Sequence, residues 1–155
     1  MSTTTRLADP WTDLDVIDRN GPRTNQAFVG LGATLAVVLD QPWIVAVLAL
    51  QLALGLTLGR KWCLPCRFWF QVLQPRFGEG PLEDSRAPRF ANRIALGFTG
   101  GATLAFLAGM PSVAWALTGT VAAVALFSAI SGFCIGCVIY ARIWGCETCA
   151  VPQRG

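Results

Sequence analysis

Residues 113–139 read VAWALTGTVAAVALFSAISGFCIGCVI and contain no charged side chain. A membrane-spanning helix needs roughly 20 apolar residues to cross a hydrocarbon core about 30 Å thick, and this block is longer than that. A soluble helical protein of 155 residues would have to hide the whole block from water. The block therefore favours a membrane protein over a soluble helical domain.

Three further blocks that are almost free of charge precede this one, at residues 27–39, 43–59 and 94–110. The chain as a whole is 54% hydrophobic and 14% charged, which departs from the soluble average in both directions. We therefore expect an all-α membrane protein with four transmembrane helices. Because the first and third blocks are short, two spans with two re-entrant segments are the alternative.

The basic residues indicate the orientation of these helices. All twelve Lys and Arg residues lie in the N-terminal tail, in the loop 60–93 or in the C-terminal tail, and the turns at Pro42 and Pro111 have none. Because basic loops stay on the cytoplasmic side, we expect a multi-pass protein of the cell inner membrane with both termini cytoplasmic. The net charge of +3 favours anionic lipid, and nothing in its pattern indicates nucleic acid.

The expected domain organisation follows from these patterns. Residues 1–23 form a polar tail, residues 24–142 form the four-helix transmembrane domain with its cytoplasmic loop, and residues 143–155 form a C-terminal dithiol tail. The first 26 residues carry four aspartates and no apolar run of signal-peptide length, so we do not expect a cleaved export signal.

An internal repeat divides the chain into two halves. Residues 32–36 read Gly-Ala-Thr-Leu-Ala, as do residues 101–105, and Pro42 recurs as Pro111 at the same offset of 69. Upstream, Gly-Pro-Arg followed by Asn25 corresponds to Ala-Pro-Arg followed by Asn92, and each half ends in Cys-x-x-Cys. The repeat predicts two duplicated helical hairpins, related by a pseudo-twofold axis along the membrane normal.

The cysteines carry the hypothesis for the functional site. All six form Cys-x-x-Cys pairs, a spacing that brings two sulfurs within reach of a disulfide bond or of one metal ion. The chain has no histidine, which excludes Cys-His dyads and mixed Cys/His zinc sites. The pairs are Cys63/Cys66, Cys134/Cys137 and Cys146/Cys149.

The first pair has the features of an attacking thiol. Pro65 disfavours helix at the residue before it and suits the first turn of a new helix, so we expect Cys63 to cap that helix. The positive end of a helix and three neighbouring basic residues favour thiolate. Cys63 is the expected nucleophile and Cys66 its resolving partner, with packing at the membrane boundary as the alternative.

The other two pairs have different surroundings. Cys134 and Cys137 are expected on one face of the fourth transmembrane helix, where burial raises the pKa of a thiol and makes the pair an acceptor or a metal ligand. Core packing is the alternative for them. Cys146 and Cys149 lie in a short polar tail, which favours a mobile dithiol arm or half of a metal-binding knuckle.

Three segments resemble a known family: residues 16–26, residues 87–91, and the run Gly-Phe-Cys-Ile-Gly-Cys that ends at Cys137. The chain is similar to the bacterial membrane proteins catalogued as domain of unknown function 4395. This resemblance implies a four-span membrane protein, often actinobacterial, whose gene can neighbour genes for thioredoxin-like proteins or thiosulfate sulfurtransferases. It marks Cys134 and Cys137 as the family motif.

Three functions remain open from the sequence. The leading one is thiol–disulfide or sulfane-sulfur exchange with a cytosolic thioredoxin-like or rhodanese-like partner, without a cofactor. The second is binding or transport of zinc or another soft metal by paired thiolates from any of the six cysteines. The third is a non-catalytic accessory subunit of a membrane complex, in which the cysteines only pack. The expected partners include the lipid bilayer and either further copies of this chain or a larger membrane complex. The expected catalytic residues are Cys63, Cys66, Cys134 and Cys137, with the two pairs converging near the cytoplasmic face.

Overall fold

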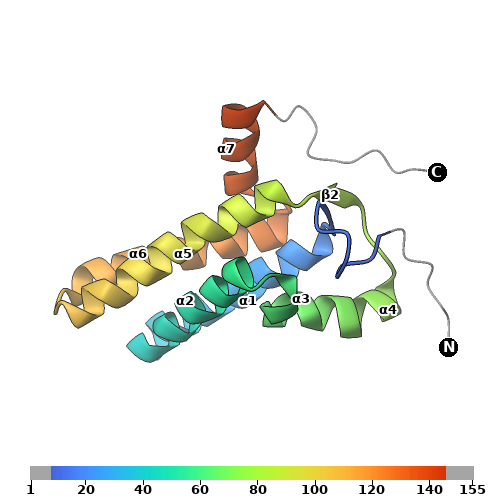
Figure 1. Ribbon diagram of the computed structural model, residues 1–155. Helices are drawn as coiled ribbons and strands as arrows, with labels where there is room; N and C mark the ends of the chain where they lie inside the picture. Colours follow the sequence, from blue (N-terminus) through green and yellow to red (C-terminus); the bar gives the residue numbers. More distant parts are fainter. Residues whose placement is uncertain (1–7, 146–155) are drawn as a thin grey trace.

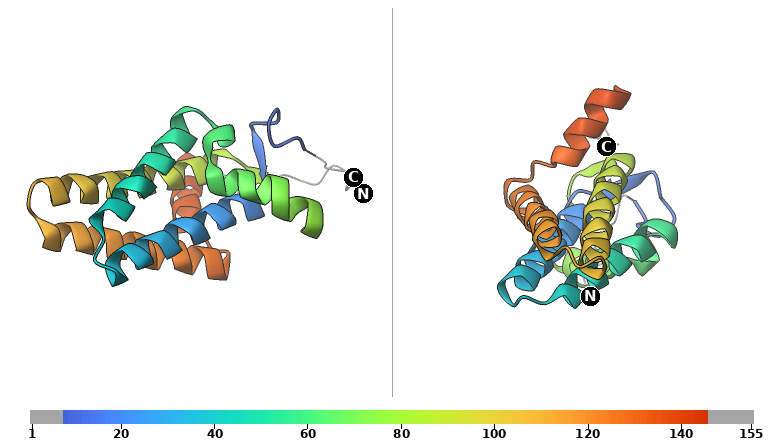
Figure 2. Two further views of the ribbon diagram at one scale, coloured as in Figure 1. Left: turned by 90° about the horizontal axis from the view of Figure 1, so that it is seen from below. Right: turned by 90° about the vertical axis from the view of Figure 1, so that its left-hand side faces the viewer.

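The computed structural model describes residues 8–145, and these residues are mostly helical. Helices α1 (Asn20–Val38) and α2 (Pro42–Thr57) form one hairpin, and α5 (Arg86–Leu107) and α6 (Pro111–Ser131) form a second. Figures 1 and 2 show both hairpin turns at the same end of an elongated bundle. Helix α1 packs mainly on α6 and α2 packs mainly on α5, so each hairpin contacts the other through both of its helices.

The shorter elements lie at the opposite end of the bundle (Figure 1). A continuous helical segment with a π-helical middle follows the first hairpin, and a separate helix that points away from the bundle follows the second. Two short antiparallel strands precede the two hairpins. These elements are β1 (Val16–Asp18), the 3₁₀ turn η1 (Arg60–Trp62), α3 (Leu64–Phe68), the π-helix η2 (Trp69–Leu73), α4 (Gln74–Phe77), β2 (Leu82–Asp84) and α7 (Ile135–Trp144).

The two hairpin turns have the same backbone structure, as a duplicated hairpin would require. Asp40 and Gly109, which are 69 residues apart, both adopt the left-handed conformation, with φ of 52° and 75°. Three backbone hydrogen bonds also recur at this offset. They are Leu39 N to Leu35 O, Asp40 N to Val37 O and Gln41 N to Ala36 O, matched by Ala108 N to Leu104 O, Gly109 N to Phe106 O and Met110 N to Ala105 O.

The strand pair lies on the pseudo-twofold axis. Ile17 pairs with Glu83. These two residues are 66 positions apart and occupy equivalent positions in the two halves of the repeat. Hydrogen bonds flank the ladder symmetrically, because Arg19 N donates to Pro81 O and Ser85 N donates to Asp15 O, both at 2.9 Å. The pairing therefore joins the two halves of the chain at equivalent positions.

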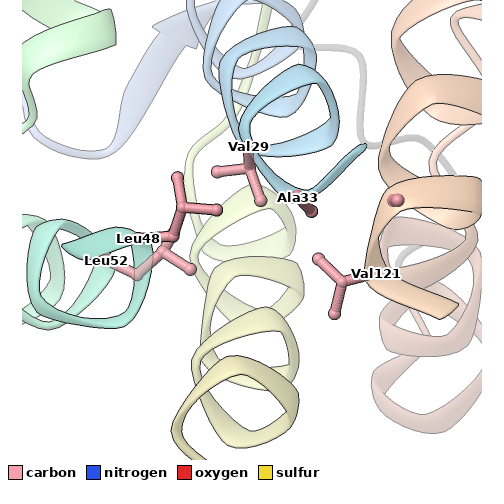
Figure 3. Close-up of a cluster of buried hydrophobic side chains, with 6 residues drawn as sticks. Val29, Ala33, Leu48, Leu52 and Val121 are labelled. Atoms are coloured by element: carbon pink, nitrogen blue, oxygen red, sulfur yellow. The ribbon is translucent and has the colours of Figure 1, made fainter. Parts of the chain in front are cut away.

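The core of the bundle is built from small and medium-sized side chains. Figure 3 shows Val29 and Ala33 of α1, Leu48 and Leu52 of α2, and Val121 of α6 packed together. Nearer the turns, a second buried cluster consists of one valine and four alanines: Val45, Ala36, Ala102, Ala105 and Ala114. Large apolar side chains lie on the outside of the same helices, for example Leu107 and Ile130, which are 80% and 81% exposed.

Among the residues that the structure describes, α6 is the helix long and apolar enough to cross a membrane. Helices α2 and α7 are apolar but shorter. The predicted all-helical fold is confirmed. The fourth apolar block is not one helix, however, because Gly132 adopts a left-handed conformation with φ of 72° and ends α6 before the cysteines.

Asp18 holds the helical segment 64–77 against β1. Its side chain is 2% exposed, and Oδ2 accepts hydrogen bonds from Trp69 Nε1 at 3.0 Å, Gln74 Nε2 at 3.1 Å and Gly80 N at 3.2 Å. Oδ1 accepts a fourth bond from Asn20 N at 2.9 Å. Because this segment begins next to Cys63, Asp18 indirectly positions the first cysteine pair.

Replacing Asp18 with alanine should lower the free energy of unfolding by about 2 kcal/mol, since buried donors on Trp69 and Gln74 lose a charged acceptor. Thermal unfolding of the purified protein would measure this loss. Asp84→Ala is the matched control, because Asp84 is the repeat counterpart and its side chain bonds only Arg86 among the described residues. We expect a loss of under about 1 kcal/mol there, and equal losses at both positions would contradict this role for Asp18.

Candidate functional site

Cys63 and Cys66 form a disulfide at the start of α3, with their Cα atoms 5.2 Å apart. Cys63 is the N-cap of this helix in an extended conformation, with φ of −79° and ψ of 101°, and Pro65 lies in the first turn. This confirms the predicted helix start. Both cysteines are buried, and the close approach of Gly55 places α2 against the β-carbon of Cys63.

Two amide side chains lie beside Cys63. Gln51 of α2 donates from Nε2 to Cys63 Sγ at 3.9 Å, and Asn25 Oδ1 of α1 lies 3.8 Å from the same sulfur. The buried Oε1 of Gln51 has no hydrogen-bond partner among the described residues. A disulfide sulfur has no proton to donate, so Asn25 Oδ1 can accept a hydrogen bond from Cys63 only when Cys63 is a thiol.

A cavity of about 100 Å³ opens onto this disulfide and is lined by two arginines, Arg60 and Arg89. The Arg60 guanidinium donates to three backbone carbonyls, those of Pro10 at 3.3 Å, Asp13 at 3.0 Å and Leu14 at 2.8 Å. Burial lowers the pKa of Arg60, and the neighbouring Arg89 lowers it further. The cavity therefore holds positive charge that would stabilise a thiolate released from the disulfide.

Cys134 and Cys137 are thiols at the start of α7. Cys134 is the N-cap in an extended conformation, with φ of −92° and ψ of 108°, close to the values at Cys63. Its sulfur accepts hydrogen bonds from Cys137 N at 3.3 Å and from Gln26 Nε2 of α1 at 3.4 Å. The two Cys-x-x-Cys centres therefore share one local backbone design.

The pKa of Cys134 is lowered to about 7, chiefly because the Cys137 side chain hydrogen-bonds to its sulfur. Burial opposes this shift, and the backbone N–H of Cys137 and the amide of Gln26 add to it. Two expectations from the sequence are wrong here. Cys134 does not lie inside the fourth helix, and its pKa is not raised, because the helix break at Gly132 makes it an N-cap with several donors.

A larger cavity, of about 210 Å³, lies beside Cys134 between α1, α5, α6 and α7. None of the residues that line it is charged, in contrast to the cavity at Cys63. Its walls are mainly apolar and include Val29, Phe98 and Val121.

Asn25 and Asn92 line both cavities. Asn25 is buried and its Nδ2 donates to Asn92 Oδ1 at 3.1 Å, so the two repeat counterparts meet across the pseudo-twofold axis. Asn25 lies in the first segment that resembles the family, Asn92 directly follows the second, and Cys134 and Cys137 end the third.

The chain belongs to the family described as Domain of unknown function (DUF4395). The family's sequence profile matches residues 17–144, which is most of the chain. No curated protein matches the sequence, and no solved structure matches the fold.

The structure places the four candidate catalytic cysteines of this DUF4395 chain at one end of the bundle, away from the hairpin turns (Figure 1). They form two centres on separate cavities. Within residues 8–145, no group of three or more Cys, Asp or Glu side chains could hold a metal ion. Cys146 and Cys149, the remaining candidate metal ligands, lie outside the described residues.

Sequence reasoning missed four polar residues of the site. Asn25, Gln26 and Gln51 lie beside the sulfurs, and Asn92 pairs with Asn25. The sequence contained features that indicate three of these residues. Asn25 and Asn92 are matched in the repeat, and Gln51 is a lone amide in an otherwise apolar block. Gln26 gave no signal, because its contact with Cys134 joins residues 108 positions apart.

Alkylation of Cys134 in the DUF4395 protein should rise with pH through about 7 and then level off, because the thiolate is the reacting form. Gln26→Leu removes one donor to that thiolate, so the midpoint should move to higher pH and the rate at pH 6 should fall a few-fold. Peptide mass spectrometry after timed iodoacetamide treatment would measure both rates. A midpoint that stays above pH 8 in the unaltered protein would contradict the hydrogen-bonding geometry at Cys134.

Proposed function

We propose that this protein is an integral membrane dithiol protein that carries out thiol–disulfide exchange. In this proposal α1, α2, α5 and α6 cross the inner membrane, and the cysteine end of the bundle with both termini faces the cytoplasm. The observation that carries the exchange function is the presence of two Cys-x-x-Cys centres with nearly the same backbone geometry in opposite redox states. One is a disulfide and the other is a dithiol.

The distribution of side-chain size supports the membrane location. The core near the turns is made mainly of alanines, whereas large apolar side chains project outward from all four helices. This is the reverse of a soluble protein, in which large apolar side chains fill the core. It is typical of membrane bundles, where small residues let helices pack closely. Examples of the exposed residues are Leu31, Leu35, Leu50, Leu104, Leu107 and Phe127.

Topology can be tested with a membrane-impermeant maleimide. Cys146 and Cys149 follow the last helix, so intact cells should show no labelling of these two residues, and permeabilised cells should show it. A cysteine introduced at Asp40, in the first hairpin turn, is the matched control and should be labelled in intact cells. Labelling of the tail pair from outside would overturn the proposed orientation.

The surroundings of the two cysteine centres support a different reaction partner for each centre. The Cys63–Cys66 disulfide lies in a cavity with Arg60 and Arg89, which suits polar partners at the cytoplasmic face. The Cys134/Cys137 dithiol lies on an uncharged cavity within the bundle. We therefore assign the first centre to exchange with a cytosolic thioredoxin-like or rhodanese-like protein, and the second to chemistry on the membrane side.

Trapping would test this assignment. In a Cys66→Ser variant, Cys63 can form a mixed disulfide with a partner but cannot resolve it, so purification under non-reducing conditions should recover the linked partner. The double variant Cys63→Ser/Cys66→Ser is the control and should recover none. A thioredoxin-like partner would indicate electron transfer, and a rhodanese-like partner would indicate sulfane-sulfur transfer. Equal recovery from both variants would count against the first centre.

A further inference from the structure

The cavity beside Cys134 has a polar end and an apolar body. Asn25, Gln26, Asn92 and Ser128 lie with Cys134 at the cysteine end of the bundle. Toward the hairpin turns the walls are almost entirely apolar. Thr120 is the exception there, and its hydroxyl already donates to Ala116 O at 2.8 Å.

The absence of charge in the lining restricts the kind of molecule that fits. An anionic headgroup, such as a carboxylate or a phosphate, would find no cation among the lining residues and would be costly to desolvate there. The amides and the hydroxyl can instead donate hydrogen bonds to a neutral carbonyl. The cavity therefore suits a neutral molecule with an apolar body and a carbonyl-bearing head.

The cavity reaches the outside of the bundle along an apolar wall. Ile94, Val124 and Ile139 line the cavity and are each 37% to 41% exposed, so we take them as its mouth. In the proposed orientation this outer surface contacts lipid, so a molecule dissolved in the bilayer can enter without crossing water.

We infer that the cavity beside Cys134 binds a lipid-soluble quinone, which accepts the two electrons of the Cys134/Cys137 dithiol. This inference rests on the proposed exchange function and names the oxidant of its second centre. A quinone has an apolar body and neutral carbonyls, and it is a two-electron acceptor, which a dithiol requires in order to become a disulfide. Cys134 caps α7 and accepts a hydrogen bond from the backbone N–H of Cys137 at 3.3 Å, so the two cysteines share the first turn of this helix.

The reaction balances in two steps. The Cys134 thiolate adds to a ring carbon of the quinone, forming a carbon–sulfur bond and placing one electron pair on the ring oxygens. The Cys137 thiolate then attacks Cys134 Sγ, so that the sulfur–sulfur bond forms, the carbon–sulfur bond breaks and the ring retains the pair. The two thiol protons end on the two quinol oxygens, and the protein ends as a Cys134–Cys137 disulfide.

The test uses the full chain in detergent, with both centres reduced, and decylubiquinone as the probe. Every ring carbon of this quinone is substituted, so a thiolate cannot remain attached at a vacant position. We expect quinol to form together with the Cys134–Cys137 disulfide, in equal amounts. Val124→Trp fills the mouth of the cavity and should slow quinol formation at least tenfold. Val113→Trp, on the same helix but outside the cavity, should leave the rate unchanged.

Oxidation of the same protein with glutathione disulfide distinguishes a failure of the quinone inference from a failure of the proposed exchange function. If glutathione disulfide converts Cys134 and Cys137 to a disulfide but decylubiquinone does not, the quinone inference is overturned and the exchange function stands. Equal quinone rates in the Val124→Trp and Val113→Trp variants would also overturn it, because reduction would then occur elsewhere. If neither oxidant produces the disulfide, the exchange function itself fails.

Discussion

A Cys137→Ser variant should stop at a mixed disulfide on Cys134 when it is oxidised with glutathione disulfide, whereas the unaltered protein should proceed to the Cys134–Cys137 disulfide. Cys137 lies one helical turn after Cys134, and its thiol hydrogen-bonds to the Cys134 sulfur. Well-oriented intramolecular reactions have effective concentrations of about 10⁵ M or more, far above any thiol in solution. Release of glutathione from Cys134 should therefore slow by at least about a thousandfold.

Peptide mass spectrometry at timed quench points would follow the glutathione adduct. Cys134→Ser is the matched control. Its remaining thiol at Cys137 lacks the N-cap position and the Gln26 donor, so it should acquire glutathione more slowly than Cys134 does in the first variant. Rapid loss of the adduct from Cys137→Ser would mean that another cysteine resolves Cys134, with the tail pair Cys146/Cys149 as the source to examine.

Replacing Gly30 with leucine should prevent stable association of the two hairpins. A β-carbon at this position would lie 2.9 Å from the backbone nitrogen of Leu126 and equally close to its side chain. Backbone atoms of α6 cannot move aside without separating α1 from α6, which form the most extensive helix contact in the bundle. We expect a loss of at least about 3 kcal/mol, at the upper end of the range for overpacked cores.

Thermal unfolding and gel filtration of the purified protein would measure this change. Gly97→Ala provides the control, because a β-carbon there meets no atom within 4 Å. A glycine in a helix interior costs about 0.5–1 kcal/mol relative to alanine, so the control should be slightly more stable than the unaltered protein. If Gly30→Leu unfolded at the same temperature as the control, the close α1–α6 contact would be disproved.

The sequence predicted the parts of the fold that depend on local pattern. The two hairpins, the turns before Pro42 and Pro111, and the helix start at Cys63 follow from apolar blocks, an exact short repeat and Pro65. The break at Gly132 was missed, because glycine is tolerated within apolar helices and the surrounding block contains no charged residue. Missing that break led to the wrong placement and the wrong pKa direction for Cys134.

Other features of the site could not follow from sequence pattern. Gln26 reaches Cys134, and Arg60 reaches the carbonyls of Pro10, Asp13 and Leu14, only because tertiary packing brings distant segments together. The difference in charge between the two cavities also depends on which side chains turn inward from four helices. The spacing within each Cys-x-x-Cys motif predicted that its two cysteines lie close together. It did not predict which side chains surround them.

The antiparallel pairing of β1 with β2 bears on the origin of the chain. Ile17 and Glu83 pair at positions related by the pseudo-twofold axis, so the same contacts would close a symmetric dimer of two identical half-length chains. Such a self-complementary dimer would carry two identical cysteine centres, and any substitution near one centre would also be present near the other. Joining the halves in one polypeptide removes that constraint. One centre can then retain arginines beside its disulfide while the other loses every charge from its cavity, which identical subunits could not achieve.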